Sequence, residues 1–349
     1  MKKQKIAIIG ASGYTGAELL RILINHPHVE IVALVANSNA GQKITDIYPN
    51  FIHYNLPDLC KIDEVNFADI DAAFCCLPHT TSQEVIAKLM SDKKNAHLKI
   101  FDLSADFRLE NIADYKKWYG HDHVASALQL QAVYGLPEIH RTKIKKSNLI
   151  ACPGCYPTSA LLPLIPLLKN NLISAKGIVI DSKSGATGAG RSLKTGNLFC
   201  EVNNSVKAYS IGKHRHTGEI EQELVKAYGS ELEVDFTPHL IPINRGIIST
   251  IYADINPQFS LQDIKNCLQT KYEDEYFVRF IEGEPNISDV VGTNFCVISA
   301  NQSRSGSKVI LVSVIDNLCK GASGQAVQNF NIVFGLDEKL GLEFAPLFP

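Results

Sequence analysis

Three evenly spaced glycines near the N-terminus constrain the fold of this chain most strongly. The loop Gly10-Ala11-Ser12-Gly13-Tyr14-Thr15-Gly16 stands between an apolar run at 5–9 and a helix-periodic segment at 17–25. Glycine allows a tight turn and the close approach of a pyrophosphate, whose charge is met by the helix N-terminus. The strand and helix on either side favour nucleotide binding by these seven residues over a purely structural turn.

The segments that follow the loop predict a parallel sheet. Strands are expected at 29–35, 72–77 and 99–103, and a helix at 81–90 with Ser82 as a possible N-cap. Alternating strands and helices are typical of a sheet whose parallel strands are joined by crossover helices.

The middle of the chain has a different pattern. Several strands, many rich in β-branched residues, are interrupted by only two helices, at 217–228 and 261–272; the strands are expected at 176–182, 246–254, 276–281, 293–299 and 308–315. This pattern predicts an α+β domain with a mixed, largely antiparallel sheet. A last helix is expected at 322–334.

Composition excludes several classes of protein. The 349 residues suffice for two domains, and the net charge of −2 with mixed signs argues against a nucleic-acid partner. The chain has neither a signal-peptide-like start nor an apolar run that could span a membrane. Most of the nine cysteines are expected to be reduced core residues, and we expect a cytoplasmic protein.

The residues after the second strand indicate which dinucleotide is bound. An NAD site usually has an acid there, but residues 36–43 contain none and offer Ser38, amides and a lysine. These groups favour the 2′-phosphate of NADP. A polar turn without a ligand is the alternative.

Cys155 is the candidate nucleophile. It precedes Tyr156-Pro157-Thr158 at the expected start of a helix, where the dipole lowers the pKa of a thiol. Gly154 allows a substrate to approach the sulfur. A thiol nucleophile and a dinucleotide loop in one chain suggest an acyl group held as a thioester while a hydride is delivered to it.

Cys152-Pro153-Gly154-Cys155 is also a C-x-x-C sequence, which leaves two other interpretations. A thioredoxin-like redox pair is possible, although such motifs usually lie near the start of a domain. A four-cysteine zinc site is disfavoured because the chain has no second C-x-x-C.

The segment Lys213-His214-Arg215-His216 brings titratable groups together before a helix. Either histidine can serve as the acid or base beside Cys155, and the other histidine and Arg215 can hold substrate. A solvated basic turn is the plain alternative. No metal site is expected, because no acid or cysteine stands at a supporting spacing.

Two further segments offer anion-binding groups. Ser184-Gly185-Ala186-Thr187-Gly188-Ala189-Gly190-Arg191 follows a strand and can line a site with backbone N–H groups, with Arg191 facing an anion. Ser104 and Arg108 follow the strand at 99–103, at the sheet edge where ligands bind in parallel sheets. They are candidates to hold a carboxylate or phosphate.

In order along the chain, these motifs closely resemble those of the N-acetyl-gamma-glutamyl-phosphate reductase family of the arginine pathway. The resemblance runs from Gly10 to Gln328 and rests on these segments: GASGYTG, DLSADFR, PGCYPT, SGATGAGR, HRH and DNLCKGASGQAVQ. Two positions depart from the family pattern, Cys152 where Asn is common and Gly218 where Pro is expected.

The resemblance implies a Rossmann-like NADP-binding domain at 1–151 and 316–349, with the C-terminal helix packed back on it. It implies a catalytic and oligomerisation domain at 152–315, in a homodimer or homotetramer. The implied reaction is reduction of N-acetyl-L-glutamyl 5-phosphate by NADPH to the 5-semialdehyde and phosphate, through a Cys155 thioester. For proton transfer we slightly prefer His216 to His214, although the sequence does not choose between them. It adds these cofactor contacts: Leu77, Pro78, Ser184, Gly185, Gly188 and Asn317.

Two competing functions share some of these features. An aspartate-semialdehyde dehydrogenase has the thiol and NADP but is expected to lack the His-Arg-His segment. A non-catalytic NADP-binding sensor is expected to leave Cys155 unreactive toward alkylation at neutral pH.

Overall fold

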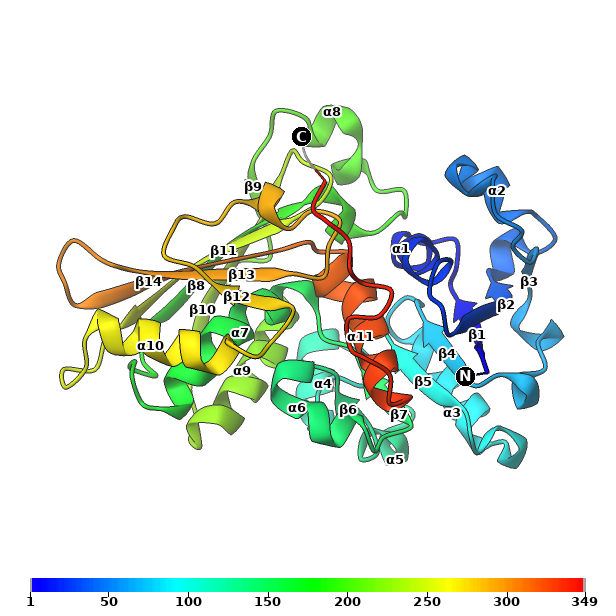
Figure 1. Cartoon of the computed structure of the whole chain (residues 1–349), viewed down its shortest axis with the longest axis horizontal. Helices are drawn as coiled ribbons and strands as arrows, with labels where there is room; N and C mark the ends of the chain where they lie inside the picture. Colours follow the sequence, from blue (N-terminus) through cyan, green and yellow to red (C-terminus); the bar gives the residue numbers. More distant parts are fainter. Residues whose placement is uncertain (1, 348–349) are drawn as a thin grey trace. The chain divides into compact units, whose positions relative to one another are not determined.

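The computed structural model describes residues 2–347 and divides the chain into two compact units (Figure 1). The first unit runs to Pro153 and resumes over Ala322–Glu343. The second covers Gly154–Gly321 and residues 344–347.

The first unit is built on one seven-stranded sheet in which every pair of neighbouring strands is parallel. Its strand order is β3-β2-β1-β4-β5-β7-β6. The strands are β1 (Gln4–Ile9), β2 (Val29–Val35), β3 (Leu59–Cys60), β4 (Ala72–Cys75), β5 (Lys99–Asp102), β6 (Val133–Tyr134) and β7 (Leu149–Ala151). The predicted parallel sheet is confirmed.

The strand order reverses at β1. Strand β2 pairs with one edge of β1, and β4 pairs with the other. In open parallel sheets the crevice for a ligand lies beyond the carboxyl ends of strands at such a switch point. Gly10 follows β1 and Cys76 follows β4, so both lie at this edge.

The helices of the first unit include the returning C-terminal helix. They are α1 (Tyr14–Leu23), α2 (Ile44–Ile47), α3 (Thr81–Ser91), α4 (Ile112–Tyr119), α5 (Ser126–Gln129), α6 (Pro137–Ile144) and α11 (Gly324–Val333). The Phe330 ring on α11 lies 5.9 Å from the rings of both Phe74 and Phe101, on β4 and β5. Ser323 Oγ also donates to Thr15 O on α1, at 2.9 Å.

Ser82 does not cap α3, so that prediction is wrong. Thr80 is the N-cap residue and has left-handed backbone angles. Ser82 lies inside the helix, fully buried, and its hydroxyl donates to Asp102 Oδ1 at 2.8 Å. Satisfying this buried carboxylate takes the hydroxyl away from the helix terminus.

The second unit contains a mixed seven-stranded sheet of order β12-β13-β14-β11-β8-β10-β9. Two neighbouring pairs, β8–β10 and β12–β13, are parallel and the others are antiparallel, as predicted. The strands are β8 (Ile178–Gly185), β9 (Lys207–Ala208), β10 (Val234–Ile241), β11 (Ile247–Asp254), β12 (Val278–Phe280), β13 (Cys296–Gln302) and β14 (Lys308–Ile315).

Three long helices cover one face of this sheet (Figure 1). They are α7 (Cys155–Lys169), α9 (His216–Tyr228) and α10 (Leu261–Tyr272); the short α8 (Phe199–Val202) precedes β9. Along β11, buried residues alternate with partly exposed ones, as expected when one face of a sheet packs on helices and the other does not.

The turn at 316–321 belongs to the second unit, although we predicted a boundary before Asp316. The Asp316 carboxylate is held by Arg245 and by the Gly292 N–H, both in that unit. Residues 344–347 also join it, and Leu347 N donates to Val291 O.

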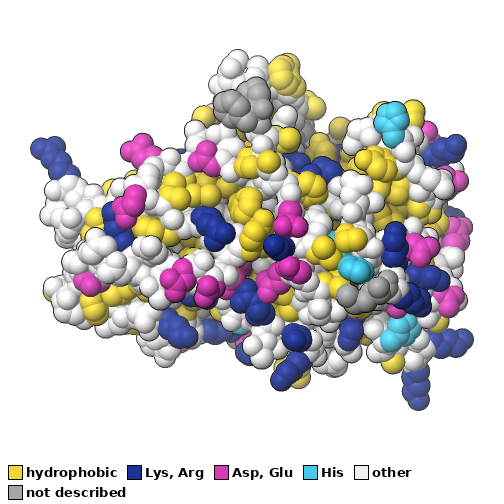
Figure 2. Space-filling view, viewed as in Figure 1, with side chains coloured by type: hydrophobic (Ala, Val, Ile, Leu, Met, Phe, Trp, Pro, Cys, Tyr) yellow, Lys and Arg dark blue, Asp and Glu magenta, His cyan; other side chains and the backbone are white. Residues whose placement is uncertain are grey.

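The surface and the helices add two observations. Lys and Arg side chains are interspersed with Asp and Glu on the face drawn in Figure 2, without a large area of one sign.

Across residues 2–347, no helix is both long and apolar enough to cross a bilayer.

Candidate active site

Cys155 is the first residue of α7 and is half-buried. The preceding Gly154 is the N-cap residue, and its N–H donates to Glu219 Oε1 at 2.7 Å. Glu219 is completely buried in the first turn of α9. Cys155 therefore lies at the positive end of the α7 dipole, and Glu219 fixes where that end lies.

Aromatic and imidazole rings gather close to this helix start. The His214 ring lies 5.6 Å from both the Tyr156 and Tyr209 rings and 4.8 Å from His216. The two tyrosine hydroxyls are 2.9 Å apart. Burial raises the pKa of Tyr209 to about 12, and the nearby Cys155 also raises it. Tyr209 was not among the residues predicted from the sequence.

The two histidines differ in their hydrogen bonds. His214 Nδ1 accepts the His216 backbone N–H at 3.1 Å, so Nδ1 carries no proton. Burial, and then the charge of Arg215, lowers the pKa of His214 to about 4. His214 is therefore neutral at pH 7 and supports the first residue of α9, which is His216.

The predicted basic residues of this region point outward. Arg215 is exposed between the two buried histidines, and Arg191 is exposed after the second glycine loop. A role of these two residues in substrate binding remains a prediction.

Gly321 brings the chain directly against Cys155. A Cβ at Gly321 would lie 2.7 Å from Cys155 Cβ, which is closer than real side chains approach. Residues Cys319–Ser323 form a π-helical turn, a feature often found at functional sites. No local pattern in the sequence indicates this contact.

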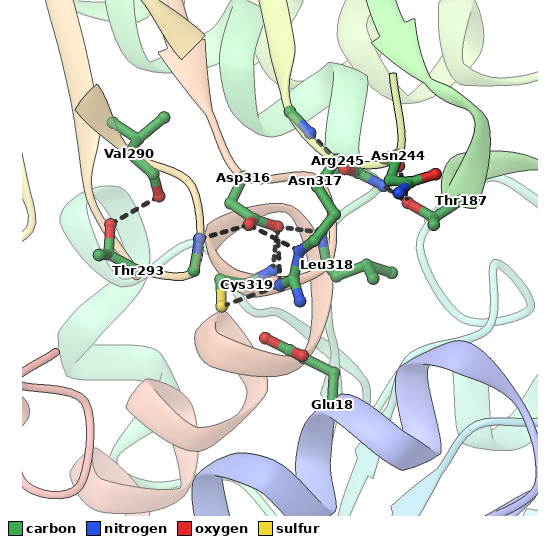
Figure 3. A network of polar contacts seen from close by, with 12 residues as sticks. Glu18, Thr187, Asn244, Arg245, Val290, Thr293, Asp316, Asn317, Leu318 and Cys319 are labelled. Carbon is green, nitrogen blue, oxygen red and sulfur yellow. Dashed lines mark hydrogen bonds and ion pairs between the residues drawn. The ribbon is translucent and has the colours of Figure 1, made fainter. Parts of the chain in front are cut away.

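The second glycine loop is attached to the same turn (Figure 3). Asn317 Nδ2 donates to Thr187 Oγ1 at 3.0 Å, and Asn317 Oδ1 accepts the Gly246 N–H at 2.8 Å. Ser184 is buried at the end of β8, and a Cβ at Gly188 would lie 3.1 Å from its Oγ. The predicted contacts Ser184, Gly185, Gly188 and Asn317 therefore lie in one network of the second unit.

The first glycine loop suits a dinucleotide. Gly10 has a φ of +88°, and a Cβ there would lie 2.4 Å from Cys76 O, so only glycine fits. Gly13 is the N-cap of α1, and the first turn of this helix contains no acid. The helix N-terminus thus has no internal carboxylate to compete with a phosphate.

The other predicted cofactor residues follow two strands of the parallel sheet. Ser38 is exposed in a short 3₁₀ turn at Asn37–Asn39, after β2. Leu77 and Pro78 follow β4, at the switch point of the sheet. Their contacts with a cofactor remain predictions.

Ser104 and Arg108 are engaged in internal contacts. Ser104 Oγ donates to Asp102 Oδ2 at 2.7 Å. Arg108 Nε donates to Cys152 O at 2.8 Å and its Nη2 donates to Leu103 O at 3.0 Å. Both side chains are buried, so these contacts support a role in holding the backbone before Gly154. Substrate binding by either residue stays a prediction.

Cys152 is poorly suited to a redox pair. It is 1% exposed, and burial raises the pKa of its thiol well above the usual value. All nine cysteines lie within residues 2–347, and none of them forms a disulfide. Within residues 2–347, no group of three or more His, Cys, Asp or Glu side chains is arranged to hold a metal ion.

Models of known protein families match both halves of the chain. Residues 5–147 match the family model described as "Semialdehyde dehydrogenase, NAD binding domain". Residues 155–317 match "Semialdehyde dehydrogenase, dimerisation domain".

Close relatives match over nearly the full length. The chain is 49% identical to the N-acetyl-gamma-glutamyl-phosphate reductase of Rhodospirillum rubrum, covering 100% of this chain and 99% of the relative. It is 51% identical to that of Afipia carboxidovorans, covering 98% of each. It is also 49% identical to the probable chloroplastic reductase of Arabidopsis thaliana, with 100% and 86% coverage.

Solved structures share the fold at low identity. Aspartate semialdehyde dehydrogenase II from Vibrio cholerae superposes with a TM-score of 0.71 at 16% identity, over 96% of this chain and 99% of that one. The Candida albicans aspartate semialdehyde dehydrogenase, solved with NADP, gives 0.66 at 18% identity, over 95% and 99%.

The lowered pKa of His214 generates a prediction about stability. The pKa of His214 is about 4 in the folded protein and 6.5 in the unfolded chain. The folded state is therefore fully stabilised above pH 6.5. It loses stability as the pH falls from 6.5 toward 4, because only the unfolded chain binds a proton in this range. Relative to His214→Gln, wild type should lose up to about 3 kcal/mol of unfolding free energy between about pH 7 and pH 4.

Urea unfolding at several pH values measures this difference. The exposed His53 provides the matched control, and His53→Gln should follow the wild-type pH dependence. Equal pH slopes for wild type and His214→Gln would contradict the buried, neutral state of His214.

Proposed function

The chain belongs to the N-acetyl-gamma-glutamyl-phosphate reductase family of semialdehyde dehydrogenases, and from this we propose how its residues carry out the reaction. The enzyme reduces N-acetyl-L-glutamyl 5-phosphate with NADPH to N-acetyl-L-glutamate 5-semialdehyde and phosphate. The observation that supports the mechanism is a half-buried thiol at the N-terminus of α7.

Cys155 forms the covalent intermediate. Its thiolate attacks the acyl-phosphate carbonyl, a carbon–sulfur bond forms, and the phosphate leaves with the electrons of the broken carbon–oxygen bond. The cofactor, when bound, supplies a hydride to the thioester carbon. The resulting thiohemiacetal collapses to the aldehyde and returns the thiolate to Cys155.

His216 is our candidate for moving the proton in this sequence. A proton donated to the oxyanion that forms on hydride addition must be removed again when the thiohemiacetal collapses to the aldehyde. His214 Nδ1 is occupied by the His216 N–H, and its lowered pKa of about 4 makes it a poor proton carrier at pH 7. We assign His214 to holding His216 and the start of α9.

NADP(H) binding is assigned to the first glycine loop. The α1 N-terminus, without acid or side-chain cap, suits the pyrophosphate. The segment after β2 carries Ser38 and no acid, which suits a 2′-phosphate better than a bare ribose hydroxyl.

The substrate carries carboxylate and phosphate groups, which require cations. Arg215 and Arg191 are exposed and belong to the same unit as Cys155. We propose that they meet these anionic groups, while the buried Arg108 supports the backbone at Cys152.

Turnover in the reverse direction tests the function. The wild-type enzyme should reduce NADP+ in the presence of phosphate and N-acetylglutamate semialdehyde, in preference to aspartate semialdehyde. Cys155→Ser should lower kcat by roughly 10³-fold or more, because it removes the nucleophile. The exposed Cys200 gives a matched control, Cys200→Ser, with unchanged turnover.

The competing functions predict different results. Preference for aspartate semialdehyde would reassign the substrate. Absence of turnover with both aldehydes, with Cys155 resistant to iodoacetamide at neutral pH, would favour a non-catalytic NADP-binding protein.

The second unit matches a dimerisation domain, and we propose a homodimer or homotetramer formed through the outer face of its sheet. On this face Tyr252 lies beside Val179 on β8 and Ile310 on β14. Val179 is 36% exposed, and the three helices cover only the opposite face. Apolar side chains on an uncovered sheet face suit contact with a second copy.

Replacing Ile310 tests this interface. Ile310→Glu should convert the oligomer to a smaller species, since a buried unpaired carboxylate opposes association. Light scattering coupled to size-exclusion chromatography measures the mass. Val206, exposed before β9, gives the control Val206→Glu. A wild-type mass for Ile310→Glu would place the interface elsewhere.

We propose that the chain works in the cytoplasm. Its nine cysteines form no disulfide in the described residues, which suits a reducing compartment. Two plant relatives are named chloroplastic, so the family also serves another compartment.

A further inference from the structure

A buried carboxylate organises the turn that contacts Cys155. Asp316 is completely buried and accepts five hydrogen bonds (Figure 3). Two come from the Arg245 guanidinium, at 2.9 and 3.1 Å. The others come from the backbone N–H groups of Gly292, Leu318 and Cys319, at 2.7, 2.8 and 3.1 Å.

Arg245, the other partner of the ion pair, follows two residues that form hydrogen bonds with the second glycine loop. Ala186 N donates to Ile243 O at 2.8 Å, and Thr187 Oγ1 donates to Asn244 O at 2.6 Å. Arg245 is the next residue. Its bidentate contact with Asp316 therefore connects the support of the glycine loop to the turn at 316–321.

Hydrogen bonds formed by Gly321 and Asn317 extend this connection to Cys155. Gly321 N donates to Asp316 O at 3.0 Å, and Gly321 packs directly on Cys155. The neighbouring Asn317 bonds to both Thr187 and the Gly246 N–H. One ion pair thus links the loop at 185–190 to the backbone beside the reactive sulfur.

The location of the pair indicates its role. The Asp316 carboxylate is buried while Arg245 is partly exposed, and such a pair is weak evidence for stability, because desolvation of the carboxylate offsets much of the attraction between the charges. Its bidentate geometry fixes direction as well as distance. We propose that Arg245 and Asp316 are positioning residues that hold the second glycine loop and the 316–321 turn in register beside Cys155 for hydride transfer. This inference rests on the proposed function.

Arg245→Met is the main test variant. It removes the guanidinium, while the Asp316 carboxylate keeps its three backbone N–H donors, so the turn can still fold. Asp316→Asn is the second variant. The asparagine side chain has one acceptor oxygen and one NH2 group. Its NH2 group would face either the guanidinium or the backbone N–H donors, and it cannot accept a hydrogen bond from them. Arg245→Lys keeps the charge but cannot form the bidentate contact.

We expect Arg245→Met to lower kcat about 10- to 100-fold, with a much smaller change in KM, because the reacting groups lose alignment rather than binding. Arg245→Lys should recover part of the loss. Iodoacetamide should alkylate Cys155 faster in Arg245→Met, by about threefold or more, as the contact with Gly321 loosens. Circular dichroism and thermal unfolding establish that the variants are folded.

A second ion pair in the same unit provides the control. Lys308 bonds to Asp254 at 2.7 Å on partly exposed ends of β14 and β11, so Asp254→Asn should leave kcat and alkylation unchanged. Wild-type kcat and alkylation in folded Arg245→Met would overturn the positioning role. If the wild-type enzyme lacks reductase activity, the proposed function fails, and the alkylation rate alone decides whether the pair positions Cys155.

Discussion

The hydrogen bond from Gly154 N–H to the buried Glu219 carboxylate is the constraint on which the site depends. It fixes the N-terminus of α7 to the first turn of α9, so the residue that follows Gly154 and the residue that begins α9 are held in one place. These residues are Cys155 and His216. A single buried acceptor therefore fixes the nucleophile and its candidate proton carrier together, without using either side chain.

The two units supply different parts of the chemistry. At the switch point of the parallel sheet, the backbone of Gly10 lies so close to Cys76 O that no other residue fits, and the first turn of α1 contains no acid. The mixed sheet supports the thiol, the imidazoles and a loop network anchored on Asp316. The proposed mechanism assigns the cofactor to the first unit and the thioester to the second.

Local patterns in the sequence predicted the parallel strands, the mixed sheet and the start of α7, because each depends on neighbouring residues. Long-range contacts were not accessible in this way. Nothing in the sequence indicated that Glu219 would meet Gly154, or that Asp316 would meet Arg245. Ser82 was predicted as a helix cap, but its hydroxyl donates a hydrogen bond to the Asp102 carboxylate, which is distant in sequence. Arg108 looked like an anion ligand, and the structure shows two of its donors on backbone carbonyls.

Trapping the covalent intermediate tests the central claim most directly. The enzyme is mixed with N-acetylglutamyl phosphate in the absence of NADPH, quenched in acid, and analysed by intact-mass and peptide mass spectrometry. The account predicts one N-acetylglutamyl group on Cys155, lost when NADPH is added before the quench and absent from Cys155→Ser. An acyl group on another residue, or reduction of the substrate with no acylated enzyme at any time, would contradict it.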